Sequence, residues 1–206
     1  LSATGTCVVT ATKAADDNYL ATTSVPFTVT IGKAAQATLT ITAPTNVTFG
    51  DADTAFTTLG GSGTGAVTFD AGSSTACSIV SNKLHIISAT GTCVVTATKA
   101  ADVNYSATTS APFTVTIAKV TLDVTASSPA AGVYGDAVPA ISPIYGSFVL
   151  GQSAADLATA PTCSVAYTQG DAPGDYATSC AGGVSANYAF NYIPGNFHVG
   201  QAAQAT

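Results

Sequence analysis

The sequence contains little charge, and four residue types are missing from it altogether. Only 8 % of its 206 residues are charged, whereas an average soluble domain has roughly 25 %. Glu, Arg, Met and Trp do not occur. Polarity is supplied instead by 34 Thr and 18 Ser. We do not expect disorder, because charge is low and Val, Ile, Leu, Phe and Tyr recur at short intervals.

The scarcity of cations excludes two classes of partner. The net charge is −6, and the five lysines are spread along the chain. Nucleic-acid binding requires clustered Lys and Arg, and a polybasic membrane patch requires the same. No stretch approaches the roughly 20 apolar residues of a membrane-spanning helix. We therefore expect no nucleic-acid partner and no membrane insertion.

An internal repeat is the most informative feature that is present. Residues 1–33 and 87–119 align without a gap at an offset of 86 and are identical at 28 of 33 positions. A shorter similarity links Gly32–Thr38 to Gly200–Thr206. A fixed period of this size indicates an array of small domains, arranged as beads on a string. The predicted division is the C-terminal part of one repeat (1–33), a complete repeat (34–119), a divergent unit (120–200) and the start of a further repeat (201–206).

The five cysteines fit this division. Cys77 lies 16 residues before Cys93, and Cys163 lies 17 residues before Cys180. Cys7 is the counterpart of Cys93, so its partner would lie before residue 1. We predict the disulfides Cys77–Cys93 and Cys163–Cys180, with Cys7 left unpaired by truncation. Such bridges indicate an extracellular setting, either secreted or at the cell surface.

Apolar residues and threonines alternate along much of the chain, which predicts strands with one buried face. Examples are Phe27–Ile31, Thr38–Thr42 and Phe113–Ile117. Further strands are expected at 54–59, 65–69, 76–80, 83–87 and 92–98. Seven short strands in one unit, separated by Gly, Ser and Asn turns, predict a β-sandwich of antiparallel sheets. The predicted fold class is therefore all-β, with tandem immunoglobulin-like β-sandwich domains.

Two segments, Gly60–Gly65 and Ser153–Thr159, have a distinct local composition. Gly60–Gly65 lacks the Lys and the following helix of a phosphate-binding loop, and we interpret it as a flexible hairpin loop. Ser153–Thr159 is the only helix-like stretch, with at most two turns.

The two complete units share two short patterns. Phe49–Ala52 and Tyr134–Ala137 both read aromatic-Gly-Asp-Ala, and Asn-Tyr occurs late in each unit at 104–105 and 187–188. We expect the shared tyrosine to place its ring in the core and its hydroxyl on a backbone group.

These residues resemble two families. With Ala76-Cys-Ser, Gly91–Asp102 and Asn104-Tyr105, residues 1–119 resemble the bacterial immunoglobulin-like (Big-type) repeats of large surface and secreted proteins. With Tyr134-Gly-Asp, Gly174-Asp-Tyr and Asn187-Tyr188, residues 120–200 are similar to the MBG domain of bacterial adhesin-type arrays. The resemblance implies sandwich folds and a role as a stalk or adhesive module, and it implies no catalytic residues.

No pattern for catalysis or cofactor binding is found. His85 and His198 have no Cys, Asp or second His at metal-ligand spacing, and no Gly-x-Ser-x-Gly occurs. The acidic pair Asp16-Asp17 becomes Asp102-Val103 in the repeat, so it is a poor catalytic candidate. We expect no enzymatic activity and no cofactor.

Calcium between domains is the one metal hypothesis, since Asp51, Asp53 and Asp136 also lie near predicted domain ends. Against it, no Asp-x-Asp-x-Asp-Gly loop occurs.

The predicted function is a structural or adhesive repeat segment of a large extracellular bacterial surface protein, stalk or filament. The alternative is a carbohydrate- or ice-binding module that uses threonine ladders, such as Thr38, Thr40 and Thr42, or exposed tyrosines. The tyrosine candidates are Tyr145, Tyr167, Tyr188 and Tyr192. Expected partners are neighbouring repeats or identical chains, which would also complete the half-domain 1–33, and surface glycans.

Overall fold

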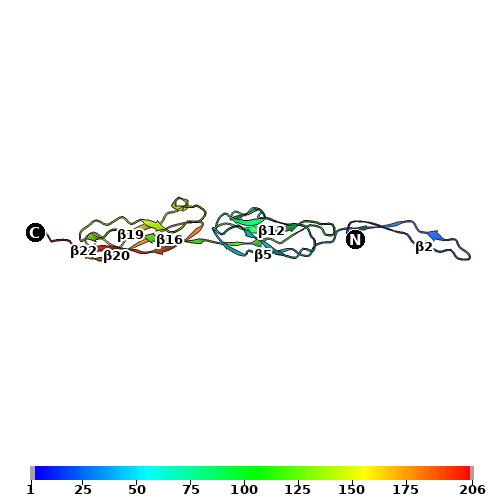
Figure 1. Cartoon of the computed structure of the whole chain (residues 1–206), viewed down its shortest axis with the longest axis horizontal. Helices are drawn as coiled ribbons and strands as arrows, with labels where there is room; N and C mark the ends of the chain where they lie inside the picture. The colour runs from blue at the N-terminus through cyan, green and yellow to red at the C-terminus, as the bar shows by residue number, and fades with distance from the viewer. Residues whose placement is uncertain (1–2, 205–206) are drawn as a thin grey trace.

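The computed structural model describes residues 3–204, and its regular secondary structure is β-strand apart from one short 3₁₀ turn, so the all-β prediction is confirmed. Figure 1 shows an elongated molecule, with a narrow hairpin at one end followed by two wider β bodies in line. We call these three parts the hairpin (residues 3–33), the central unit (34–119) and the C-terminal unit (120–200). Within residues 3–204, no helix has the length and apolar character needed to cross a membrane.

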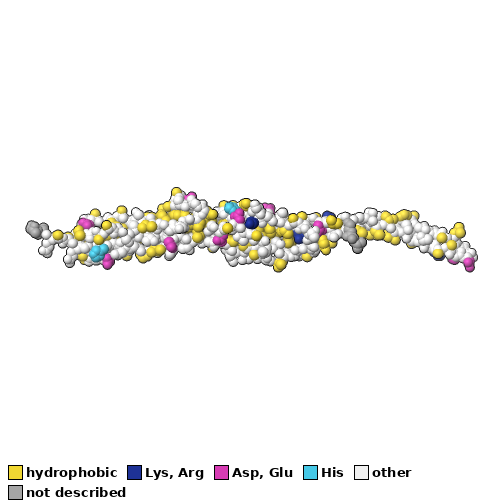
Figure 2. Space-filling view, in the orientation of Figure 1, with side chains coloured by type: hydrophobic (Ala, Val, Ile, Leu, Met, Phe, Trp, Pro, Cys, Tyr) yellow, Lys and Arg dark blue, Asp and Glu magenta, His cyan; other side chains and the backbone are white. Residues whose placement is uncertain are grey.

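The hairpin is a two-stranded ladder. β1 (Gly5–Val9) pairs antiparallel with β4 (Phe27–Ile31), and β2 (Thr12–Lys13) pairs with β3 (Thr22–Thr23). All residues of these four strands are exposed. Figure 2 shows hydrophobic side chains lying along this thin end of the molecule.

The central unit folds around a small aliphatic core. Its strands are β5 (Thr40–Ala43), β6 (Asn46–Thr48), β7 (Thr54–Ala55), β8 (Thr57–Leu59), β9 (Val67–Asp70), β10 (Cys77–Val80), β11 (Lys83–Ile86), β12 (Val94–Lys99), β13 (Thr108–Thr109), β14 (Phe113–Thr114) and β15 (Thr116–Ala118). β12 is flanked by β9 on one side and by β13 and β14 on the other, and β11 lies between β10 and β7. The alternating side chains that face inward include Leu84, Val95 and Ala97, each 0 % exposed.

The C-terminal unit contains two larger sheets. Its strands are β16 (Val120–Ala126), β17 (Gly132–Val133), β18 (Pro143–Tyr145), β19 (Thr162–Val165), β20 (Gly174–Ala181), β21 (Tyr188–Ile193) and β22 (Gly195–Gly200). The sheet orders are β18-β16-β21 and β17-β22-β20-β19. The helix-like stretch forms one 3₁₀ turn at Ala154–Asp156, which the Ser153 side chain caps.

Strand pairing stays within each part of the molecule. Among the described residues, every ladder joins strands of the hairpin, of the central unit or of the C-terminal unit, and none joins two parts. Apolar packing does cross from one wide unit to the other, because a single buried cluster contains Phe49 of the central unit and Tyr188 of the C-terminal unit.

Two expectations about the sheets are wrong. Three pairs are parallel, namely β6 with β15, β16 with β21, and β17 with β22. Alternation indicates that one face of a strand is buried, but it does not specify the direction of the neighbouring strand. Phe113–Ile117 is also not one strand, because β15 leaves β12 after β14 to pair with β6.

The Gly60–Gly65 segment is not a hairpin loop. It connects β8, which pairs with β5, to β9, which pairs with β12, so it crosses between two sheets. The Thr64 amide donates to Asp102 Oδ2 at 2.6 Å, and a Cβ at Gly60 would collide with the carbonyl oxygen of Thr38. The glycines are needed for this close approach.

Candidate functional site

Each wide unit contains one disulfide. Cys77 on β10 is bonded to Cys93 just before β12, with an Sγ–Sγ distance of 1.98 Å. Cys163 on β19 is bonded to Cys180, its register partner on β20, at 2.01 Å. These are the pairs that the spacing predicts. Cys7 is a free, exposed thiol on the hairpin.

An aromatic contact joins the central unit to the C-terminal unit. The ring of Phe49 packs edge-on against Tyr188, with centroids 6.1 Å apart, and the two side chains belong to residues that are only 3 % and 2 % exposed. The Tyr188 hydroxyl accepts a hydrogen bond from the Val149 amide at 3.1 Å, which is the type of role expected for this tyrosine. Gly50 permits the approach, since a Cβ there would lie 2.9 Å from Val149 Cγ2.

The polar contacts at this junction centre on Asn187. Its Oδ1 accepts from the Ala89 amide at 3.0 Å and from the Ser88 hydroxyl at 3.1 Å. A single residue, Lys119, separates β15 from β16, and its Nζ donates to the Ser185 carbonyl at 2.7 Å. The junction is therefore short and fixed on two sides.

The same contact occurs where the hairpin meets the central unit. The Ala3 amide donates to Asn104 Oδ1 at 3.2 Å. Ala3 is the repeat counterpart of Ala89, and Asn104 precedes the shared tyrosine as Asn187 does. Sequence reasoning assigned a role only to the tyrosine of each Asn-Tyr pair. The signal that could have identified the asparagine is its presence in both units, which otherwise differ in sequence.

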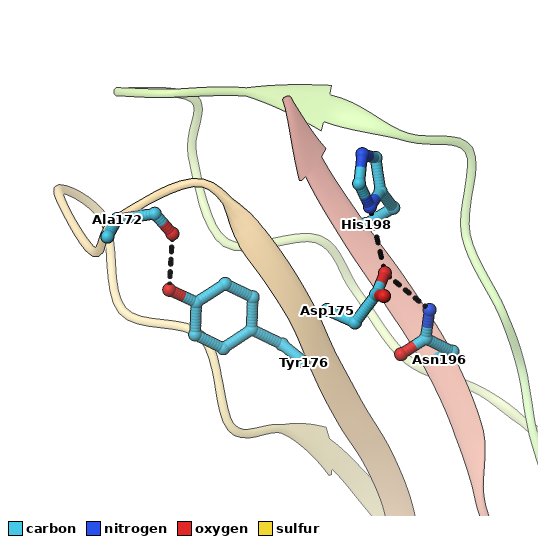
Figure 3. A network of polar contacts seen from close by, with 5 residues as sticks. All are labelled: Ala172, Asp175, Tyr176, Asn196 and His198. Carbon is cyan, nitrogen blue, oxygen red and sulfur yellow. Dashed lines mark hydrogen bonds and ion pairs between the residues drawn. The ribbon is translucent and has the colours of Figure 1, made fainter. Parts of the chain in front are cut away.

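Both histidines form exposed pairs with aspartates. In Figure 3, His198 Nδ1 lies 2.8 Å from Asp175 Oδ1, and Asn196 Nδ2 donates to the same oxygen at 3.1 Å. The hydrogen bond from His198, followed by that from Asn196, lowers the pKa of Asp175. His198 and Asp175 are register partners on β22 and β20. The arrangement is a cross-strand polar pair, which stabilises a sheet.

The neighbouring Tyr176 in Figure 3 donates its hydroxyl to the Ala172 carbonyl at 2.5 Å. Burial, and secondarily the Asp171 charge, raises the pKa of Tyr176. This tyrosine therefore stays protonated as a hydrogen-bond donor near neutral pH.

The second pair joins His85 Nδ1 to Asp53 Oδ1 at 2.7 Å. Its members are 32 residues apart in sequence, so spacing alone could not reveal it. Among residues 3–204, no three His, Cys, Asp or Glu side chains lie close enough together to hold a metal ion. The other aspartates of the calcium hypothesis lie in tight turns, where Asp51 Oδ2 accepts from the Thr48 amide and Asp136 Oδ2 from the Val133 amide.

Asp102 stabilises the turn at residues 102–105 of the central unit. Its Oδ1 accepts from the Asn104 and Tyr105 amides, both at 2.8 Å, while Oδ2 accepts from Thr64. Hydrogen bonds from the backbone of Thr64, Asn104 and Tyr105, in that order, lower the pKa of Asp102 to about 2. The ionised carboxylate of Asp102 thus connects the Gly60–Gly65 segment to the turn at residues 102–105.

A shallow hollow of about 300 Å³ lies beside β12. Its lining includes Asp70, Ser74 and Thr92, and the Asp70 carboxylate already accepts a hydrogen bond from the Gly72 amide. One carboxylate among hydroxyls offers neither a nucleophile–base pair nor two facing acids.

The tyrosine candidates for glycan binding are partly contradicted. Tyr167 and Tyr188 are only 3 % and 2 % exposed, so they belong to the core and cannot offer a platform. Tyr145 is half-buried, and Tyr192 stacks on Phe190 with centroids 5.9 Å apart. The threonines of the proposed ladder are exposed, and one of them makes a contact within the protein, since Thr42 Oγ1 lies 2.8 Å from Thr57 Oγ1.

Comparisons with known proteins find a family match for one part of the chain. Residues 122–198 match the family described as MBG domain (YGX type), which corresponds to most of the C-terminal unit. No curated protein matches the sequence. A crystal structure of Drosophila N-cadherin EC1-4 is similar at 11 % identity and a TM-score of 0.36, over 98 % of this chain and 58 % of that one. The resemblance of residues 1–119 to Big-type repeats stays a prediction.

Proposed function

We propose that this chain is a stiff spacer segment of a large extracellular bacterial surface protein, a stalk or filament in which β units stand end to end. In this proposal it catalyses no reaction and holds other parts of the protein away from the cell. The observation that carries the proposal is the Asn–Ala contact found at both junctions, Asn104 with Ala3 and Asn187 with Ala89.

A repeated junction favours a constant angle between successive units. Bending at the second junction would break the two hydrogen bonds to Asn187, each contributing about 1 kcal/mol. It would also separate the Phe49 and Tyr188 rings, a contact contributing about 0.5–1.5 kcal/mol. Together these exceed the thermal energy several times, so the aligned arrangement should dominate.

The disulfides and the family match support an extracellular location for the proposed spacer. Two intrachain disulfides are typical of secreted and surface-exposed proteins. The MBG match at residues 122–198 supports a module of surface arrays, as the resemblance in the sequence implied. Among residues 3–204, no contact favours the alternative of a carbohydrate- or ice-binding module over the spacer.

Small-angle X-ray scattering of the full chain tests the spacer function. The doubly substituted variant Phe49→Ala/Asn187→Ala should show a shorter mean maximum dimension and a broader distance distribution than wild type. Asn196→Ala is the matched control, because this exposed asparagine contacts Asp175 far from either junction. Scattering from the junction variant that is indistinguishable from wild type would refute the proposed stiffness, and so would a wild-type chain that already samples many bent shapes.

A further inference from the structure

We propose that each wide unit contains a mechanical clamp that resists tension along the chain, formed by its first and last segments lying side by side in parallel. In the C-terminal unit these segments are residues 120–134 and 187–200, and in the central unit they are residues 34–49 and 104–118. A load-bearing role goes beyond the spacer function proposed above, because a rod can stand straight without withstanding a pull at its ends.

Tension on the chain acts along the long axis of each unit. The chain enters the C-terminal unit beside the central unit and leaves it at the opposite end, and it passes through the central unit in the same direction (Figure 1). A pull at the two ends of a unit therefore draws its first segment one way and its last segment the other way. The bonds between these two segments decide how the unit responds.

In the C-terminal unit the two segments are bonded at both ends and between them. β16 pairs in parallel with β21 along the whole of β21, and β17 pairs in parallel with β22. Between these ladders, Ser128 Oγ accepts a hydrogen bond from the Asn196 amide at 3.0 Å. Beyond β17, the Tyr134 amide donates to the Gly200 carbonyl at 2.9 Å. Because the paired strands run in the same direction, a pull slides one past the other and loads these bonds together.

The central unit has the same arrangement in a shorter form. At one end the Ala34 amide donates to the Asn104 carbonyl at 2.9 Å, and at the other end β6 pairs in parallel with β15. Directly after β6, the Phe49 amide donates to the Ala118 carbonyl at 2.9 Å. β6 and β15 have three residues each, whereas β21 has six. We therefore expect the central unit to unfold at a lower force than the C-terminal unit.

The two disulfides lie outside the clamps. Cys77–Cys93 and Cys163–Cys180 each join residues that lie between the first and the last segment of their unit, so a pull reaches them only after the clamp has opened. The bonded cysteines are 16 and 17 residues apart in sequence, and this length of chain cannot extend while the bond is intact. Each disulfide therefore shortens the length that is released when its unit unfolds.

Single-molecule force spectroscopy of the full chain, held at its two termini, tests the clamps. Two high-force events are expected, one for each wide unit, and the antiparallel β1–β4 hairpin should be peeled open before either. The variant Cys163→Ala/Cys180→Ala identifies the C-terminal unit. Since an extended chain spans about 3.3–3.6 Å per residue, this variant should lengthen one event by about 50–60 Å and leave the other unchanged.

The direction of the pull is the decisive control. Thr121 and Ala189 are register partners on β16 and β21, and both are exposed. Handles attached through azide-bearing residues at these two positions pull the same ladder apart sideways, one row at a time. The force that opens the C-terminal unit should then be at least about threefold lower than in the pull at the termini, although the ladder is the same.

Two neighbouring serines provide matched variants. Ser128 Oγ accepts from the Asn196 amide within the clamp, whereas Ser127 Oγ accepts from the Ser142 amide, also at 3.0 Å, outside it. Substitution of either serine with alanine removes one acceptor of a backbone hydrogen bond. At a fixed force applied at the termini, Ser128→Ala should unfold the C-terminal unit about fivefold faster, whereas Ser127→Ala should stay within about twofold of wild type.

Three outcomes would overturn the inference. They are equal opening forces in the two directions of pull, equal effects of Ser128→Ala and Ser127→Ala, and opening of both wide units at forces no higher than that of the hairpin. None of them alters the scattering of the junction variant, because bending between the units leaves the bonds within each clamp intact. Failure of the clamp is therefore distinguishable from failure of the spacer function.

Discussion

The repeat offers an internal pair of positions that separates burial from every local effect. Val95 and its counterpart Val9 lie in strands of the same local sequence and register, yet they are 0 % and 50 % exposed. Substituting each valine with alanine changes β-propensity equally. The difference in the free energy of unfolding between the two variants therefore measures the effect of burying the valine side chain.

The magnitude follows from the core. Val95→Ala removes two buried methyl groups, which cost about 0.8 kcal/mol each in transfer, and the remaining cavity raises the total to about 2–3 kcal/mol. For a unit of this size that loss lowers the melting midpoint by roughly 10–20 °C. Val9→Ala is expected to cost at most about 1 kcal/mol, confined to the hairpin, because half of that side chain is already in water.

Differential scanning calorimetry of the full chain measures the midpoints, and hydrogen exchange assigns each transition to a part of the chain. Val95→Ala should lower the transition of the central unit, while Val9→Ala should leave the transitions of both wide units unchanged. Equal losses from the two substitutions would show that Val9 is as deeply buried as Val95, and would refute the burial contrast.

Three other predictions concern single contacts. Replacing Cys163 and Cys180 together with alanine should destabilise the C-terminal unit by about 3 kcal/mol, measured by thermal unfolding, and a midpoint equal to wild type would contradict this. Tyr188→Phe should cost about 1 kcal/mol in denaturant unfolding, because the Val149 amide loses its acceptor; a wild-type value would show that water replaces the hydroxyl. The pKa of Asp102 is lowered from 3.8 to about 2 on folding, so its contribution is complete above about pH 4 and is lost as the pH falls toward about 2. In acid unfolding followed by circular dichroism, Asp102→Asn should make the stability depend less on pH between about pH 4 and pH 2. An unchanged pH dependence would contradict the role assigned to Asp102.

Local patterns in the sequence located several strands, but they did not predict where a strand breaks, as at Phe113–Ile117, or which strands pair. The pattern at 83–87 predicted the strand β11, and in the structure Leu84 and Ile86 are its buried residues. A local pattern suffices here, because the alternation of side chains is a property of the strand itself. The parallel β16–β21 pair could not be predicted this way, since its partners are separated by most of the unit. Register and direction between distant strands depend on how whole sheets stack.

The candidate site shows the same limit. Asp175 and His198 are 23 residues apart and meet only because β20 and β22 pair. Asn187 could be recognised as shared by two units, but its acceptor role depends on where the Ala89 amide lies after folding. Tyr167 carries no sequence signal that separates it from an exposed tyrosine, yet its hydroxyl donates to the Asp136 carbonyl from within a core.

The scarcity of charge and the form of the junctions are connected physically. If the ends of two neighbouring units were charged, packing them against each other would remove the ions from water, at a cost of several kcal/mol per ion. The ends of the units that meet here present an aromatic edge, an amide oxygen and backbone amides, together with the charged donor Lys119. Neutral contacts of this kind are hardly screened by salt, whereas exposed ion pairs weaken as ionic strength rises. A surface rich in threonine and serine keeps such units hydrated while few charged groups are needed at their ends. The proposed stiffness should therefore be nearly the same in dilute buffer and at high ionic strength. A distance distribution from scattering that broadens with added salt would show that charge, and not packing, aligns the units.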